Sequence, residues 1–422
     1  MVFRIFCCGL LAILLTNCKT AKLNKTLSSS LESSFYNEQF TGFYIYDVDK
    51  DKVLLNHNGN KYFTPASNTK IFTLYTGLTM LPDSIPSFYY ESPNDSIITI
   101  QGNGDPTLFH PYFKDSTAYS LVKDYKHVNL VLDNIEDRRY APGWAWEDFD
   151  SYFSPERSAL PIYGNVVTVR NENSLKIAPE YFKEHLKIAD DFYGRKEFEN
   201  TFYYKKGRTK ETEIPMIMKP SLVKVLLEDV IEGEVTIVKQ GPSKPSELQY
   251  SIPSDSLYRR MMEVSDNFLA EQILILASST ISDTLSSDKA RDYMLKNELD
   301  DLKQSPRWVD GSGLSRYNLF SPASFVQVLT RMYNEVERDR LLQFFPVGGE
   351  FGTIENWYAG KDKPYVYAKT GSLGNNHNLS GYLITDSGKV LVFSFMNNHY
   401  KHSNNAIKER METMFEWLRD NY

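Results

Sequence analysis

The sequence has little cysteine, no surplus of basic residues and only one long apolar run. Three cysteines occur in 422 residues, at Cys7, Cys8 and Cys18, so a scaffold held by several disulfides is excluded. The formal net charge of −7 argues against a broad nucleic-acid-binding surface, because such a surface needs basic residues to neutralise phosphates. With 41 % hydrophobic and 24 % charged residues, the composition is that of a soluble globular protein.

Motifs of several other enzyme classes are also missing. Gly102 and Gly104 do not belong to a phosphate-binding loop, and Asp105 and Pro106 would break a helix that began there. None of the seven histidines lies in a His-Glu-x-x-His zinc motif, and no Gly-x-Ser-x-Gly elbow is present to carry a Ser-His-Asp triad. We therefore expect no metal, no other cofactor and no nucleic-acid partner.

The N-terminus has the layout of a signal peptide. Arg4 precedes the apolar run 5–15, which is too short to span a bilayer, and Cys18 follows in a context that resembles a bacterial lipobox. We predict a lipoprotein signal peptide over 1–18 with lipid attachment at Cys18; an ordinary cleaved signal is the alternative. Residues 19–34, rich in Lys, Asn, Thr and Ser, are predicted to be a tether. No acidic run follows Cys18, which favours a lipid anchor in the cell envelope that faces the periplasm.

Hydrophobic periodicity predicts an α+β protein in which a sheet is flanked by helices. Residues 43–55 alternate as a β-hairpin with its turn at 47–52, and a buried helix begins near Ser67. Short strands and turns fill the stretch from 81 to 253. The remaining elements follow in order: helices over 256–278 and 322–342, strands at 366–368, 379–385 and 390–396, and a helix over 405–418. We predict one domain from 35–85 and 250–422, with a strand-rich domain, 86–249, inserted after the helix of Ser67.

Ser67 and Lys70 are a candidate nucleophile and base. A serine hydroxyl needs a base, and the residue three positions later on a helix lies within reach of it. The same spacing also occurs at Ser120/Lys123, Ser221/Lys224 and Ser286/Lys289, so spacing alone proves little. The first pair is distinguished by its place at a strand-to-helix junction, before an apolar helix that can hold both side chains. The alternative is ordinary polarity on a solvated helix.

Two further motifs complete a candidate site. Lys369-Thr370-Gly371-Ser372 follows a predicted strand, and its lysine supplies a cation that would favour a neutral Lys70; the alternative is a turn that has no need of the lysine. Ser265-Asp266-Asn267, near the middle of a predicted helix, offers a hydroxyl for proton relay and a carboxamide for a substrate amide. Ser-x-Asn also occurs at Ser92 and Ser403, so this element is weak alone.

The order Ser-x-x-Lys, Ser-Asp-Asn, Lys-Thr-Gly is the signature of penicillin-binding proteins and β-lactamases. The sequence resembles the D-alanyl-D-alanine carboxypeptidase/endopeptidase family of low-molecular-mass class C penicillin-binding proteins, peptidase family S13. Further segments resemble that family, at 102–108, 141–148, 310–316 and 379–382. The resemblance implies a serine β-lactamase/transpeptidase-like fold for the domain that carries the motifs, with peptidoglycan stem peptides as substrates and β-lactam antibiotics as covalent inhibitors.

The resemblance also implies a role for each motif residue. Ser67 attacks the carbonyl of the penultimate D-alanine, Lys70 accepts its proton, and Ser265 relays a proton to the leaving group. The family's substrate-binding positions match Asn267 for the peptide backbone and Lys369, Thr370 and Ser372 for the terminal carboxylate. The backbone N–H groups of Ser67 and Ser372 form an oxyanion hole. Asp148 matches the position from which the inserted domain approaches the side chain of a meso-diaminopimelate residue; its alternative is an exposed loop carboxylate.

Two other functions fit the same motifs. A β-lactamase-like hydrolase or esterase would use the same nucleophile but would deacylate fast, so rapid turnover of penicillin would identify it. A catalytically silent, lipid-anchored protein that binds the cell wall would keep the pocket without useful turnover. The complete set of motif side chains favours an active enzyme over a silent one.

Overall fold

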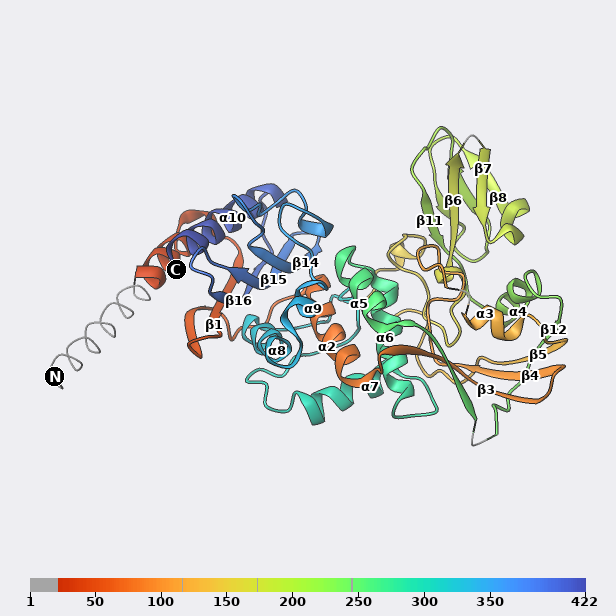
Figure 1. The fold of residues 1–422 in the computed structure, drawn as a ribbon. Coiled ribbons are helices and arrows are strands. Elements are labelled where there is room, and N and C mark those ends of the chain that lie inside the picture. The colour runs from red at the N-terminus through yellow and green to blue at the C-terminus, as the bar shows by residue number, and fades with distance from the viewer. Residues whose placement is uncertain (1–21, 116, 173, 244–245) are drawn as a thin grey trace.

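The computed structural model describes residues 22–115, 117–172, 174–243 and 246–422 (Figure 1). The predicted signal peptide and its lipid site, Cys18, lie outside the described residues. Figure 1 shows a body of sheet and helices that contains both the first described residues and the C-terminus, with two groups of strands projecting from its far side. Among the helices in these ranges, none is both long enough and apolar enough to cross a membrane.

A five-stranded antiparallel sheet forms the centre of the body, as the sequence predicted. Its strand order is β14-β15-β16-β1-β2. The strands are β1 (Phe40–Asp47), β2 (Lys52–His57), β14 (Val366–Leu373), β15 (Asn376–Ile384) and β16 (Val390–Asn398). The predicted hairpin is β1 and β2, paired from Phe43 opposite His57 to Asp47 opposite Lys52. The pairing of β1 with β16 thus joins the N-terminal hairpin and the C-terminal strands in one sheet.

Helices cover both faces of this sheet, and each face has its own apolar core. On one face lie α2 (Lys70–Met80), α8 (Pro322–Glu335) and α9 (Arg338–Leu342), packed on side chains such as Tyr382 and Val392. On the other face lies α10 (Asn404–Asn421), whose Phe415 makes edge-on or tilted ring contacts with Phe393, Phe395 and Phe43. The prediction of a sheet flanked by helices is therefore confirmed.

The tether predicted over 19–34 is wrong for most of its length. Residues 22–31 are helical, and Leu23, Leu27 and Leu31 are buried in the same core as α10. Their spacing of four residues places all three on one helix face, which overrides the polar composition of the intervening residues. This segment is therefore part of the folded body.

The predicted helix 256–278 is two helices with a break between them. These are α5 (Ser254–Glu263) and α6 (Asn267–Ser279). Ser265 has a left-handed backbone conformation, with φ of 62°, and Asp266 caps α6 by accepting a hydrogen bond from the N–H of Leu269. The Ser-Asp-Asn motif therefore occupies a sharp corner rather than the middle of a helix. Helix α7 (Ser287–Tyr293) follows and packs on α6.

The stretch between α2 and α5 is strand-rich, as predicted. One mixed sheet has the order β12-β5-β4-β3-β13. Its antiparallel pair β3 (Ser84–Asn94) and β13 (Glu247–Pro253) carries the chain out from α2 and back to α5. The rest of this sheet is β4 (Ile97–Gly102), β5 (His127–Val131) and β12 (Glu234–Ile237), with α3 (Thr117–Val122) and α4 (Pro220–Glu228) beside it.

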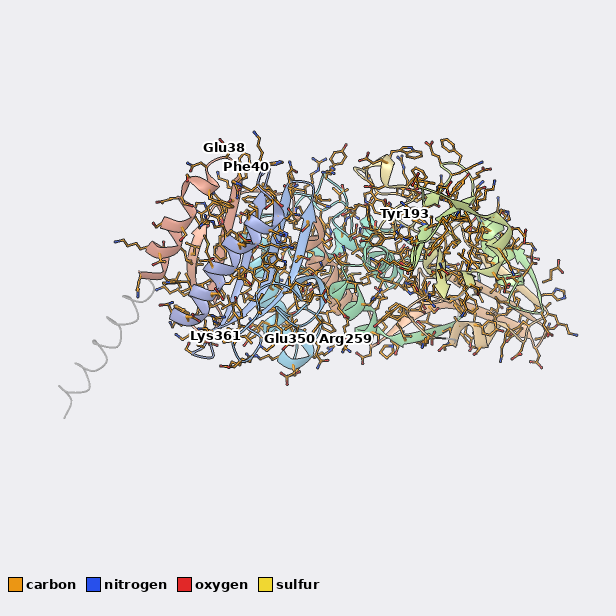
Figure 2. All side chains as sticks on the ribbon, turned by 90° about the horizontal axis from the view of Figure 1, so that it is seen from above. Glu38, Phe40, Tyr193, Arg259, Glu350 and Lys361 are labelled. Carbon is orange, nitrogen blue, oxygen red and sulfur yellow. The ribbon has the colours of Figure 1, made fainter. Side chains whose placement is uncertain are left out.

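A second lobe of this insertion contains two three-stranded sheets. The first has the order β11-β6-β7 and consists of β6 (Val166–Glu172), β7 (Ser174–Ala178) and β11 (Thr212–Pro215); the second consists of β8 (Leu186–Ala189), β9 (Gly194–Arg195) and β10 (Phe202–Lys205). Figure 2 shows Tyr193 on this lobe, away from Glu38 and Phe40 on the body. One apolar core contains side chains of the mixed five-stranded sheet and of this second lobe. The division into 35–85 with 250–422 and an inserted 86–249 stays a proposal.

Candidate active site

Ser67 lies in a tight turn that leads into α2. The turn, Ala66–Thr69, is a 3₁₀ turn rather than a full α-helical turn, and Ala66 has a left-handed φ of 47°. Strand β14 crosses directly beside it: a Cβ on Gly371 would lie 2.3 Å from the carbonyl oxygen of Pro65. Only glycine allows this approach. The predicted Lys-Thr-Gly motif is therefore held against the predicted nucleophile.

Lys70 is buried beneath Ser67 and bridges the predicted motifs. Its Nζ lies 3.0 Å from Ser67 Oγ, 2.6 Å from Asn267 Oδ1 and 2.7 Å from the carbonyl oxygen of Ser312. Two of these three partners can only accept a hydrogen bond. The lysine is thus held in place by Asn267 and Ser312 and is directed at the serine hydroxyl.

Lys369 forms a second buried cation next to the first. Its Nζ donates to Ser265 Oγ at 2.8 Å and to the carbonyl oxygen of Thr370 at 2.8 Å. The motif lies within β14, which continues to Leu373, and not at the end of a shorter strand as predicted. The structure brings the predicted residues into two hydrogen-bonded groups, Ser67 with Lys70 and Asn267, and Ser265 with Lys369. The two groups meet at one cavity, which is lined by Ser67, Ser265 and Asn267.

Burial governs the charge state of both lysines. It lowers the pKa of Lys70 to about 8, against the opposing effect of the carboxylates of Asp266, Asp310 and Glu271. It lowers the pKa of Lys369 well below its ordinary value, and repulsion from Lys70 adds to that shift. From the sequence we expected the cation of Lys369 to favour a neutral Lys70. The largest cause of the lowered pKa of Lys70 is desolvation of Lys70 itself.

Asn267 has a different immediate partner from the one expected. Its Oδ1 accepts from Lys70, and its Nδ2 donates to the carbonyl oxygen of Phe153 at 2.9 Å. The residue therefore joins the insertion, which carries Phe153, to Lys70 in the body. Its amide still borders the cavity above Ser67.

Thr370 and Ser372 line that cavity from β14. Thr370 Oγ1 donates to Thr353 Oγ1 at 2.8 Å, and Ser372 Oγ lies 2.8 Å from His377 Nδ1. His377 is buried, and its Nε2 has no hydrogen-bond partner within the described chain. Burial, with a smaller effect of Lys408, lowers the pKa of His377 to about 3, so its ring is neutral. Nothing in the sequence pattern had singled out this histidine.

The cavity above Ser67 has a volume of about 520 Å³ and is lined by residues of the body and of the insertion. The catalytic body supplies Ser265, Asn267, Thr370 and Ser372, among other residues. The insertion supplies Tyr152, Phe153 and Glu213. Among the described residues, Asp148 is not part of the lining. It lies on the turn Trp146–Asp148 with its side chain partly buried, and burial followed by repulsion from Glu147 raises its pKa.

Glu213 is instead the carboxylate that the insertion directs into the cavity. It lies on β11, and burial together with repulsion from Asp266 raises its pKa to about 7. Sequence reasoning missed it, because a glutamate on a short strand gives no signal until the pairing of that strand is known.

Sequence reasoning also missed the side chains that hold the backbone around the Ser312 carbonyl in place. The backbone N–H of Ser312 donates to Glu271 Oε1 at 2.8 Å, and Glu271 Oε2 lies 3.5 Å from Nη1 of Arg157, a residue of the insertion. Asp310 accepts from the N–H groups of Gly313 and Ser315. The only signal was the resemblance of 310–316 to a family segment, which had been given no role.

Comparisons with known proteins agree with this architecture. A sequence model of the D-Ala-D-Ala carboxypeptidase 3 (S13) family matches residues 23–182 and 217–421. The D-alanyl-D-alanine carboxypeptidase DacB of Haemophilus influenzae is 24 % identical over 443 aligned residues, which cover 90 % of this chain and 90 % of that protein.

Two solved structures show the fold. The crystal structure of penicillin-binding protein 4 from Haemophilus influenzae superposes with a TM-score of 0.73 at 18 % identity and covers 93 % of this chain and 99 % of that one. A penicillin G-acylated predatory endopeptidase of Bdellovibrio bacteriovorus superposes with a TM-score of 0.51 at 14 % identity, covering 90 % of this chain and 93 % of that one. The predicted transpeptidase-like fold is therefore confirmed.

Proposed function

Because the chain belongs to the D-Ala-D-Ala carboxypeptidase 3 (S13) family, we propose that it is a serine D-Ala-D-Ala carboxypeptidase/endopeptidase of peptidoglycan stem peptides that works through an acyl-enzyme on Ser67. The observation that supports this best is the contact of 3.0 Å between Ser67 Oγ and the buried Lys70 Nζ. A base must lie within hydrogen-bond reach of the proton that it removes.

The partners of Lys70 favour one direction of proton transfer. A neutral lysine has two N–H donors and one lone pair. The amide oxygen of Asn267 and the carbonyl oxygen of Ser312 both require donors, so they take the two N–H groups. The lone pair is then left for Ser67, whose Oγ–H it accepts as the oxygen attacks the carbonyl carbon of the penultimate D-alanine. The tetrahedral oxyanion is placed near the backbone N–H groups of Ser67 and Ser372, where two donors typically lower the barrier by a few kcal/mol.

Collapse of the intermediate requires a proton for the leaving amine. Ser265 Oγ accepts a hydrogen bond from Lys369, so its own O–H is available to the leaving nitrogen. The proton that Lys70 took from Ser67 then replaces the proton that Ser265 gives up, which returns Lys70 to its neutral form. Lys369, Thr370 and Ser372 then bind the carboxylate of the departing D-alanine. Water hydrolyses the ester and regenerates Ser67. A β-lactam ring enters the same acylation step and remains bound as a covalent inhibitor.

Labelling with a fluorescent penicillin, together with release of D-alanine from a pentapeptide, tests this function. The wild-type protein should form a stable fluorescent adduct and release D-alanine. Ser67→Ala should do neither, while Ser221→Ala, which alters a serine with the same spacing to a lysine, should do both. Covalent labelling of Ser67→Ala would disprove the assignment of the nucleophile. Rapid release of hydrolysed penicillin by the wild type would identify a β-lactamase instead.

We further propose that the enzyme works in the cell envelope on a lipid anchor at Cys18 that faces the periplasm, as the N-terminal sequence pattern favours. Metabolic labelling with a radioactive fatty acid should mark the full-length chain and not Cys18→Ala. Equal labelling of both proteins would show that the lipid is not attached at Cys18. Release of the variant from the membrane fraction would show that no other segment holds the protein there.

A further inference from the structure

A second cavity lies on the insertion, outside the site described above. It has a volume of about 310 Å³. Its lining includes the aromatic rings of Phe109 and Tyr163, the hydroxyl-bearing Thr168 and the cationic Arg170 and Lys176. We call it the distal cavity. These side chains supply flat aromatic surface, a hydroxyl and positive charge, and the rest of the lining is aliphatic: Pro111, Ile177 and Ala178.

The aromatic wall of the distal cavity is fixed in place. The rings of Phe109 and Tyr163 are stacked, with centroids 5.2 Å apart and an angle of 25° between planes. Both residues have left-handed backbones, with φ of 54° and 55°, and the N–H of Tyr163 donates to the carbonyl oxygen of Leu108. Both side chains remain partly exposed. A flat apolar surface of this kind suits the face of a sugar ring or another planar group.

Thr168 is the group in the cavity that lacks a partner. Its side chain is only 5 % exposed, and its Oγ1 has no hydrogen-bond partner among the residues that the structure describes. A buried hydroxyl without a partner is unfavourable, and a rotation about χ1 would turn it toward a bound molecule. The polar group is therefore suited to a ligand that supplies a hydrogen bond.

The register of the β11-β6-β7 sheet joins the distal cavity to the active site. Glu213, which lines the cavity above Ser67, pairs directly with Thr168, which lines the distal cavity. Directly opposed residues point to the same face, with Cβ atoms roughly 5 Å apart. Arg170 lies two residues further along the same strand face, opposite Lys176. One sheet face thus runs from the catalytic cavity into the distal one.

We propose that the distal cavity binds the sugar-linked end of the stem peptide whose D-alanyl end lies at Ser67. This inference rests on the proposed function. Three residues precede the acylated D-alanine in a pentapeptide, and in extended form they reach roughly 10 Å. The sugar therefore lies beyond the catalytic cavity, on the surface that borders it. The stacked rings match the sugar, and the two cations match the free α-carboxylate that a γ-linked glutamate carries beside it.

Two cationic side chains of the β6-β7 pair border the distal cavity. Arg170 lies on β6, where it also pairs with Glu211, the residue before β11, and Lys176 lies opposite it on β7. A carboxylate that enters beside them gains a charge-assisted contact.

Three soluble substrates distinguish the contribution of the sugar to kcat/KM from that of the carboxylate. The first is a pentapeptide with an amidated second residue and no sugar, the second has the free carboxylate, and the third has the carboxylate and a muramyl sugar. For the wild type, kcat/KM should rise at each step, by up to about tenfold for the carboxylate, as expected for one charge-assisted contact. Lys176→Gln should reduce the gain in kcat/KM that the free carboxylate gives, and Tyr163→Leu should reduce the gain that the sugar gives. Lys187→Gln, an exposed lysine on β8, is the matched control and should change neither step.

The outcomes distinguish this inference from the proposed function. Equal kcat/KM for all three substrates in an active wild-type enzyme would overturn the inference alone. So would an equal loss in Lys176→Gln and Lys187→Gln. Failure of the wild type to release D-alanine from any substrate would instead overturn the proposed function. Labelling of each variant by fluorescent penicillin reports folding, and calorimetric binding of the muramyl peptide to Ser67→Ala, with and without Tyr163→Leu, tests the cavity without turnover.

Discussion

The two sides of the cavity above Ser67 are built in different ways. On the catalytic body, Lys70 and Lys369 are fully buried, and each has at least two hydrogen bonds that fix its position. On the insertion, Tyr152 is 69 % exposed, and Glu213 is only partly buried. A base needs desolvation and fixed geometry, whereas a surface that selects among substrates can remain accessible to solvent.

The difference predicts which kinetic constant each side controls. Changes on the catalytic body remove interactions with the reacting atoms, so they should lower kcat. Changes on the insertion remove contacts with parts of the substrate that do not react, so they should raise KM. Two residues cross this division: Phe153 binds Asn267 through its carbonyl oxygen, and Arg157 pairs with Glu271. The insertion therefore also supports the groups that hold Lys70.

The largest effect should follow from Lys70→Met. Methionine fills most of the buried volume of lysine but cannot accept the proton of Ser67, so acylation by penicillin should slow by about 10³-fold or more. Lys224→Met is the matched control, since Lys224 also follows a serine by three residues but pairs with Glu228. Stopped-flow labelling measures the rate, and thermal unfolding shows whether each variant is folded. If Lys70→Met were acylated at a rate within tenfold of the wild-type rate, Lys70 would not be the base.

The next effect is on pH dependence. Since burial lowers the pKa of Lys70 to about 8, its neutral form is gained as the pH rises through that value. The acylation rate should therefore increase about 50-fold between pH 6 and pH 8 and level off above pH 9. The measurement is single-turnover acylation in buffers of constant ionic strength. A flat profile from pH 6 to pH 9 would mean that Lys70 does not limit proton removal.

A smaller effect should follow from His377→Phe. His377 orients the Ser372 hydroxyl from below, so its loss should lower kcat/KM about tenfold for a peptide that ends in a carboxylate. The same peptide with a C-terminal amide should be affected far less. His377→Asn, whose amide can still form a hydrogen bond with Ser372, should restore part of the loss. Equal losses for acid and amide substrates would indicate a purely structural role.

Side-chain patterns predicted which residues meet at this site better than they predicted the groups that hold those residues in place. Ser67, Lys70, Ser265 and Lys369 belong to motifs whose residue types are required by acyl transfer, and the structure brings them together. The Ser312 carbonyl, which holds Lys70, has no such signal, because every residue has a carbonyl. Only the fold shows which one is used.

Two of our predictions about the fold were wrong for the same reason: each relied on one sequence signal and gave too little weight to another. Apolar spacing continues through α5 and α6, so it hid the corner at Ser265, although Asp266 is a favourable N-cap residue. Polar composition suggested a tether before Ser34, although Leu23, Leu27 and Leu31 have helical spacing. Burial depends on partners far away in the sequence, here α10, which local patterns do not reveal.

The smallest expected effect tests the insertion side directly. Because the pKa of Glu213 is raised to about 7, its carboxylate charge is gained as the pH rises through neutrality. For a stem peptide with lysine as its third residue, KM should therefore fall about threefold between pH 6 and pH 8, while kcat changes through Lys70 alone. Glu213→Gln should abolish this change in KM, and Glu180→Gln, an exposed carboxylate of the same lobe, should not. If Glu213→Gln lowered kcat instead, the insertion would act on the reacting atoms, and the division between the two sides of the cavity would not hold.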